Sequence, residues 1–121
     1  MDIARNIGRI DRTAWTLGHN GSVYVQGTFK DLTANDIRPG IFAYAPCWAA
    51  VDPGMTLEAH SHDTVEIYAF VAGEGRMRLD DEWFDVKAGV AVNIPSNAVH
   101  QVTNEASAVG PVVWLSIGLK A

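Results

Sequence analysis

Short apolar runs recur along most of this chain, separated by Gly, Pro, Asn and Asp. Runs punctuated in this way are typical of short β-strands, whereas an amphipathic helix needs a longer stretch with apolar residues at every third or fourth position. This feature predicts a single all-β domain. The expected strands cover residues 23–29, 41–51, 55–62, 66–71, 76–79, 83–86, 90–94, 99–103 and 111–117.

Individual segments and turn residues predict further features of the fold. Two segments, 12–17 and 33–37, could turn helically, but neither carries a sustained apolar stripe. Asn20-Gly21 predicts a tight reversal ahead of the first strand, because both residues tolerate a positive φ. Pro46 lies inside a strand-like run and cannot donate a hydrogen bond to a sheet, so we expect an edge position or a bulge there.

The segment 66–71 is apolar on both faces beyond Glu66. A strand with one face in water would alternate polar and apolar side chains. The two faces carry Tyr68 and Phe70 on one side and Ile67, Ala69 and Val71 on the other. We therefore expect a closed barrel or a sandwich with a further layer, supplied by a second copy of the chain in a homodimer.

Length and charge limit the classes of function. The chain has 121 residues, which suits one domain over residues 1–121. Nine Lys and Arg against 14 Asp and Glu give a net charge of −5, which argues against nucleic acid or an anionic membrane surface as the partner. We expect a cytoplasmic protein for three reasons. The chain has a single cysteine, it does not start with a basic stretch followed by an apolar one, and it has no apolar run long enough to span a membrane.

If the chain binds a metal ion, imidazole and carboxylate groups must hold it, because the chain has only one cysteine. His60 and His62 are two residues apart on an expected strand, so they project from the same face. Residues 63–65 are short enough to form a turn that returns Glu66 beside them, and one hairpin would then supply three ligands. His100 would supply the fourth if its strand crosses opposite this hairpin.

At these residues the chain resembles the cupin superfamily, in its small single-domain form with two sequence motifs. The first motif is carried by Gly54, His60, His62, Glu66 and Gly73, and the second by Gly89, Pro95, His100 and Asn104. Asn97 stands where the second motif has a glycine, and asparagine tolerates the left-handed backbone region better than most residues. The resemblance covers residues 54–104 and implies a double-stranded β-helix, which is a jelly-roll-like barrel.

The resemblance also implies that His60, His62, Glu66 and His100 bind one divalent transition-metal ion. Such mixed nitrogen and oxygen ligation suits Fe, Mn, Ni, Co, Cu or Zn, and in octahedral geometry it leaves two positions for a ligand. The alternative is a degenerate cupin that keeps these residues without an ion. His19, the fourth histidine, lies outside the motifs and is expected to be an ordinary turn residue.

Alternation along the expected strands predicts the pocket. Glu58 and Thr56 share the expected face of His60 and His62. Glu58 is therefore a candidate general base or a hydrogen-bond partner of a metal ligand, although a bulge or a rim position would leave it in water. Thr56 and three further side chains are candidates for contact with a substrate, unless they only fill the barrel. These three are Tyr68, Phe70 and Val102.

Five other side chains have two possible roles each. Tyr44, Trp48 and Trp114 either line the cavity or pack in the core or at an interface. Arg76 and Arg78 share one face of an expected strand, where they either bind a carboxylate substrate or belong to a face in solvent or at an interface.

Fold does not fix function, so the chemistry stays open at this level. We expect a metal-dependent enzyme that acts on a small organic molecule bound at the metal. A dioxygenase-type reaction is favoured, because the expected pocket is largely apolar and no pair of nucleophile and base is visible. The alternatives are a metal-dependent isomerase, polyketide cyclase, lyase or decarboxylase, and a cupin that binds a small ligand without catalysis.

Overall fold

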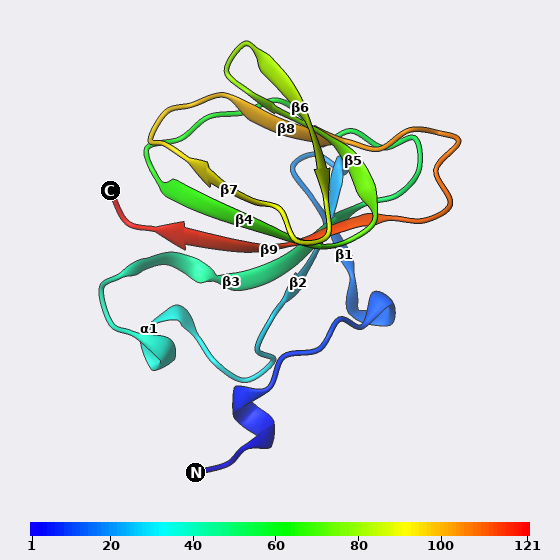
Figure 1. Cartoon of the computed structure of the whole chain (residues 1–121). Helices are drawn as coiled ribbons and strands as arrows, with labels where there is room; N and C mark the ends of the chain where they lie inside the picture. The colour runs from blue at the N-terminus through cyan, green and yellow to red at the C-terminus, as the bar shows by residue number, and fades with distance from the viewer.

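Two antiparallel sheets pack face to face in the computed structural model, which describes all 121 residues (Figure 1). The larger sheet has six strands in the order β1-β2-β3-β9-β4-β7, and the smaller has three in the order β6-β5-β8. The strands are β1 (Thr16–Gly18), β2 (Val23–Gly27), β3 (Phe42–Val51), β4 (Val65–Ala72), β5 (Glu74–Leu79), β6 (Glu82–Lys87), β7 (Ala91–Ile94), β8 (His100–Thr103) and β9 (Val112–Leu119). The all-β, jelly-roll-like architecture is confirmed, but no strand pairing joins the sheets, so hydrogen bonds do not close the barrel.

Helical structure is limited to three short elements. They are the 3₁₀ turns η1 (Ala4–Asn6) and η2 (Arg12–Ala14) and the helix α1 (Ala34–Ile37). Thr33 caps α1, because its hydroxyl accepts from the Asp36 amide while the Asp36 carboxylate accepts from the Thr33 amide. None of these helices is long and apolar enough to cross a membrane.

The N-terminal part of the chain differs from the expectation. The segment 12–17 is helical only at its start, and from Thr16 it forms β1, which pairs with β2 across the turn at Asn20 and Gly21. This tight reversal is confirmed, with φ values of 58° and 79°. The helical expectation for the rest of 12–17 was wrong because pairing with β2 satisfies the backbone groups of these residues.

The expected strand at 55–62 is also wrong. This segment makes only isolated bridges to β8, at Thr56 with Thr103 and at His60 with His100. Between the two bridges, the segment from Thr56 to His60 has one residue more than the facing part of β8. An extra residue on one of two paired segments is a β-bulge. The bulge reverses the alternation, so Leu57 is buried whereas Thr56 and Glu58 are exposed.

Residues 63–65 do not close a hairpin. His60 bridges to β8 in the small sheet, whereas Glu66 lies on β4 in the large sheet, between β7 and β9. Both edges of β4 are already paired, so the segment before it has no edge to join. The chain instead crosses from one sheet to the other here, and the ligand candidates come from both layers.

Pro46 is accommodated by a bulge in a central strand. β3 pairs with β2 on one side and β9 on the other, so the edge position is excluded. The register of β3 against β9 shifts between Tyr44 and Cys47, which confirms the expected bulge. This irregularity sets the direction of the Tyr44 side chain.

The core fills the space between the sheets. Trp114 is the largest fully buried side chain, and Met77 of the small sheet is completely inaccessible. The rest of the cluster comes from both sheets and includes Val86, Val102, Phe70, Ile94 and Val112. Packing between the sheets therefore fixes the distance across which the ligand candidates meet.

Candidate metal centre

Four side chains that are distant in sequence meet in one cluster at the junction of the two sheets. His60, His62, Glu66 and His100 each offer a ligand atom, and these atoms lie within 4.8 Å of one another. His60 and His100 are held as a cross-strand pair by reciprocal backbone hydrogen bonds of 3.2 and 2.9 Å. The cluster predicted from the spacing of these residues is therefore formed.

Backbone carbonyls fix the protonation of the three imidazoles. The Nδ1 atom of His60 lies 2.9 Å from the carbonyl oxygen of Glu58, that of His62 lies 3.0 Å from the oxygen of Thr64, and that of His100 lies 2.9 Å from the oxygen of Ala98. A carbonyl oxygen can only accept, so each Nδ1 carries the proton and donates it. Each neutral ring then presents the lone pair of Nε2, as metal-bound histidines do.

These lone pairs point toward a carboxylate, and a cation between them would stabilise this arrangement of acceptors. Glu66 Oε1 lies 2.7 Å from His62 Nε2 and 3.0 Å from His100 Nε2. Glu66 Oε1 and His100 Nε2 are both fully buried and have no hydrogen-bond partner in the protein. Buried acceptors without a donor are costly, and a divalent ion bound between them would remove that cost. The donor set fits the divalent transition metals that accept imidazole and carboxylate together.

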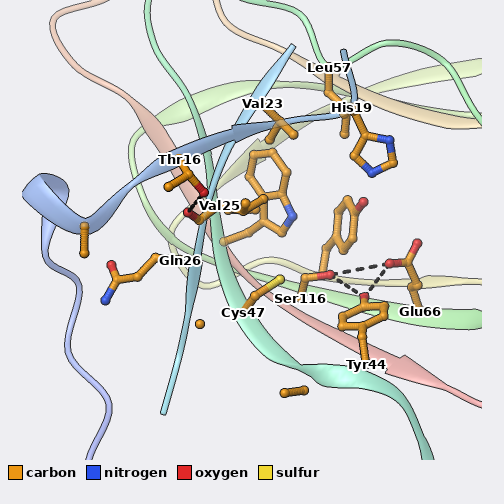
Figure 2. A pocket seen from close by; sticks show the side chains of 16 residues that line it. Thr16, His19, Val23, Val25, Gln26, Tyr44, Cys47, Leu57, Glu66 and Ser116 are labelled. Carbon is orange, nitrogen blue, oxygen red and sulfur yellow. Dashed lines mark hydrogen bonds between the residues drawn. The ribbon is translucent and has the colours of Figure 1, made fainter. Parts of the chain in front are cut away.

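The second carboxylate oxygen of Glu66 is held by hydroxyl groups (Figure 2). Tyr44 Oη donates to Glu66 Oε2. Ser116 Oγ lies 2.6 Å from Tyr44 Oη and 3.5 Å from the same carboxylate oxygen. Such hydrogen bonds orient a ligating carboxylate and leave its other oxygen free for the ion.

The electrostatics keep the donors in the forms that bind a metal. Burial is the main cause that lowers the pKa of His60, so its ring stays neutral. Burial opposes ionisation of Glu66, but the pKa of Glu66 stays below its ordinary value, and the hydrogen bond from the Tyr44 hydroxyl is one of the contacts that favour the carboxylate. Burial and the Glu66 carboxylate both raise the pKa of Tyr44, so this hydroxyl keeps its proton.

A cavity of about 450 Å³ adjoins the cluster through Glu66. Most of its lining is apolar, with Val23, Leu57, Tyr68 and Trp114 among the contributors. Figure 2 shows the Tyr44, Ser116 and Glu66 network on one side of the cavity and His19 beside Leu57 on another. The cavity is large enough for a small organic molecule.

The predicted pocket residues are not all in the cavity. Tyr68 lines it, whereas Phe70 and Val102 are buried in the core and do not. Thr56 and Glu58 are exposed outside the lining, because the bulge turns them away, so their expected inward face was wrong. Glu58 does not contact the four ligand atoms, and its carboxylate accepts hydrogen bonds from Asn20 instead.

Three lining residues that contact a residue of the cluster were not predicted as site residues. The sequence does not decide whether Tyr44 faces the cavity or the core, because alternation cannot be followed across the bulge at Pro46. Ser116 could have been noticed, since it is the one hydroxyl within the apolar strand β9 and shares a face with Trp114. His19 lines the cavity with its ring centroid 4.3 Å from that of His60, and no local pattern marks it.

The motif residues that do not contact the cluster hold the backbone around it. Asn104 is 3% exposed, and its side-chain amide donates to the carbonyls of Val51 and Gly110. Asn97 has a φ of 66°, so asparagine does adopt the left-handed conformation at the glycine position of the second motif. Its amide donates to the carbonyl of His62 at 2.7 Å, which ties this turn to the ligand segment.

Comparison with known proteins agrees with this architecture. An uncharacterized protein, MJ1618, from Methanocaldococcus jannaschii is 40% identical over 57 residues, which span 46% of this chain and 46% of that protein. The fold is similar to a cupin 2 conserved barrel domain protein from Salinispora arenicola, with a TM-score of 0.74, 22% identity and coverage of 95% and 88% of the two chains. It is also similar to a predicted oxalate decarboxylase from Thermotoga maritima, with a TM-score of 0.70, 19% identity and coverage of 82% and 81%.

The family model of the cupin domain matches residues 47–118, which include both motifs and all four residues of the cluster. The match extends from the central strand β3 to β9, so it covers most of both sheets. Because this match covers more than half of the chain and includes both motifs, the chain belongs to the cupin domain family.

Proposed function

We propose that this cupin is a metal-dependent enzyme that acts on a small, largely apolar organic molecule bound to the ion through an oxygen atom. The observation that carries the proposal is the convergence of three Nε2 lone pairs and one carboxylate beside an apolar cavity. A divalent ion held there would act as a Lewis acid or, as Fe(II), would supply dioxygen chemistry.

The residues of the chain would bind and shield the reacting molecule. Tyr68 and Trp114 form an apolar wall that excludes water. Tyr44 and Ser116 present hydroxyl groups at the same end of the cavity as Glu66. Because the pKa of Tyr44 is raised, its hydroxyl serves as a hydrogen-bond donor and not as a base.

The charge of the cavity favours a neutral or singly charged molecule. No lysine or arginine is among the residues that line it. Arg76 and Arg78 lie on β5, where Arg76 pairs with Asp85 at 3.3 Å and Arg78 bonds to Gln101, so neither grips a substrate in this cavity. One divalent ion with one carboxylate and neutral imidazoles leaves about one positive charge, which would balance a single anionic group.

Two reaction types are supported by different features of the cavity. The apolar lining supports a dioxygenase-type reaction, because dioxygen partitions into apolar space and reactive species need protection from water. The network of Tyr44, Ser116 and Glu66 supports a reaction without dioxygen, such as that of an isomerase, a cyclase, a lyase or a decarboxylase, because it fixes Glu66 and with it the place where a Lewis-acidic ion would polarise the bound molecule. We place the dioxygenase-type reaction first.

Metal analysis of the purified protein tests the site itself. The wild type is expected to hold about one ion per chain, and His60→Ala/His62→Ala is expected to hold almost none, because half of the donors are lost. His19→Asn is the matched control, since it removes a histidine outside the cluster and should keep the ion. Equal metal content in the wild type and the double variant would contradict the proposed site.

Oxygen consumption separates the reaction types. The protein loaded with Fe(II) is mixed with a panel of diketones, catechols, thiols and keto acids, and oxygen uptake and loss of each compound are followed together. Uptake that matches the loss of one compound supports the dioxygenase-type reaction. Loss of a compound without uptake assigns the second type, and neither event with any compound favours a cupin that binds a ligand without catalysis.

A further inference from the structure

His19 belongs neither to the two cupin motifs nor to the four-residue cluster, although it lies in the lining of the cavity. It lies in the turn between β1 and β2, lines the cavity and is exposed to solvent, so it stands at the mouth. Its ring packs on that of His60 with a centroid distance of 4.3 Å and an interplanar angle of 34°. No hydrogen bond of its ring nitrogens occurs within the chain, so they are free to bond to another molecule.

The turn that carries His19 is rigidly built. His19 and Asn20 both adopt left-handed φ values, 46° and 58°. The amide of Ser22 donates to the carbonyls of Gly18 and His19 at 3.1 and 3.2 Å, and its hydroxyl donates to the His19 carbonyl at 2.7 Å. Residues other than Asn, Asp, His and Gly rarely adopt this backbone conformation, so the turn is specified by its residue types.

Glu58 ties this turn to the metal cluster. Its carboxylate oxygens accept from the Asn20 side-chain amide at 3.1 and 3.2 Å. Its backbone amide donates to Ser22 Oγ at 3.0 Å, and its carbonyl accepts from His60 Nδ1 at 2.9 Å. One residue therefore holds both the turn and a ligand candidate.

We infer that His19 is a substrate-contacting residue at the mouth of the cavity, and that Asn20 and Glu58 are the positioning pair that holds it there. This inference rests on the proposed function. It adds that the bound molecule carries a second hydrogen-bonding group, besides the one at the metal, that reaches the mouth of the cavity next to His60. The imidazole of His19 is the group that recognises this second group.

Two small molecules of different size that bind to metal ions test the role of His19. The Co(II)-loaded protein is titrated with azide, which reaches only the ion, and with 4-nitrocatechol, which also fills the cavity, and binding is followed by visible absorption. His19→Asn keeps the left-handed backbone and removes the ring. It is expected to weaken binding of 4-nitrocatechol about tenfold and to change that of azide less than about twofold, since one hydrogen bond and one ring contact are lost.

A reciprocal exchange tests the positioning pair. Asn20→Asp keeps the turn conformation but places two carboxylates face to face, so it is expected to reproduce the selective loss of 4-nitrocatechol binding. Adding Glu58→Gln should restore binding, because the amide and the carboxylate have then changed places. Glu82→Gln, which alters an exposed carboxylate at the start of β6, is the control and should have no effect.

The outcomes separate the inference from the proposed function. Unchanged binding of both ligands by His19→Asn, or equal weakening of both, would overturn the contact role of His19. Failure of the double variant to restore binding would overturn the positioning pair. If the wild type binds no Co(II), the proposed function fails, and the inference fails with it.

Discussion

Three backbone carbonyls decide what the imidazoles of the cluster can do. Because each Nδ1 donates to a carbonyl of the local segment, each Nε2 is left as an acceptor that faces the common centre. Glu66 is constrained in the same way, since its Oε2 is occupied by hydroxyl donors and its Oε1 is not. The site is thus prepared for a cation by hydrogen bonds outside it.

Removing the hydroxyl of Tyr44 should weaken the metal site without removing a ligand. Tyr44→Phe is expected to lower the affinity for Zn(II) or Co(II) by about 10- to 100-fold, because Glu66 loses a donor that orients it. Competition with a chromophoric chelator measures this change. Tyr24→Phe, which alters a half-buried tyrosine on β2 outside the cavity lining, is the control, and equal loss in both variants would contradict the orienting role.

The metal-free protein should lose stability on acidification. The folded state lowers the pKa of His60 below its ordinary 6.5, mainly by burial, so the unfolded chain takes up a proton first and stability falls as the pH drops through about 6.5. Glu66, whose pKa is lowered below 4.5, adds a second loss as the pH falls further. Urea unfolding of chelator-treated protein between pH 8 and pH 4 measures both.

His60→Gln should remove the first of these losses and keep the second. An unchanged profile for this variant between pH 8 and pH 5 would show that His60 is not the group responsible. Glu66 is tested in the same series by Glu66→Gln, which should flatten the profile below pH 5.

At the scale of elements, two bulges and one crossing determine which side chains reach the site. The bulge near Pro46 directs Tyr44 toward Glu66, and the bulge between Thr56 and His60 brings Leu57 into the core. The crossing at residues 63–65 takes the chain from the small sheet to β4. Ligands from both sheets can therefore surround a single point.

The turn between β4 and β5 depends on a glycine for two reasons. Gly73 has a φ of 77°, and a Cβ there would lie 2.1 Å from the carbonyl oxygen of Pro111. Gly73→Ala should lower the free energy of unfolding by about 2–5 kcal/mol, since backbone strain and a clash with backbone atoms add together. Urea denaturation measures this change.

Gly21→Ala is the matched control for this substitution. Gly21 has a similar φ of 79°, but no atom lies within 4 Å of the position that a Cβ would take. Only the strain of about 1–2 kcal/mol should appear in this variant. Equal destabilisation of both variants would show that the contact with Pro111 contributes nothing.

At the scale of the whole molecule, the large sheet has an outer face that is apolar. Ile67 on β4 is paired directly with Ile117 on β9, and both are half-buried on the face opposite the core. Val71 on the same face of β4 is 42% exposed. The expectation of a homodimer therefore stays a prediction, with this face as the surface that a second copy would cover.

Sedimentation velocity measures the oligomeric state. At micromolar concentration the wild type should sediment as a particle of twice the 13.1 kDa mass of the chain. Ile117→Lys should shift it to the monomer, because a charge would be buried in the interface. Trp83→Lys, on the small sheet, should leave the dimer unchanged, and a wild type that sediments as a monomer would refute the prediction.

Most of the fold could be predicted because strands and turns are local. The apolar runs and the turn residues predicted every strand of the core, and they allowed a short helical turn over residues 33–37, where the structure has α1. The sequence could not reveal the bulge before His60, because an extra residue in a strand changes only the pairing with β8. For that reason the alternation argument placed Glu58 on the wrong face.

By itself the sequence determined the all-β class and the four residues of the candidate metal centre, because their spacing and type are properties of the chain. Only the tertiary structure decided that these ligands come from two sheets, that Tyr44 and Ser116 hold Glu66, and that His19 stands at the mouth. The physical reason is that each of these contacts joins segments far apart in the chain. The geometry of these contacts depends on how the two sheets pack, and the packing cannot be predicted from a local sequence pattern.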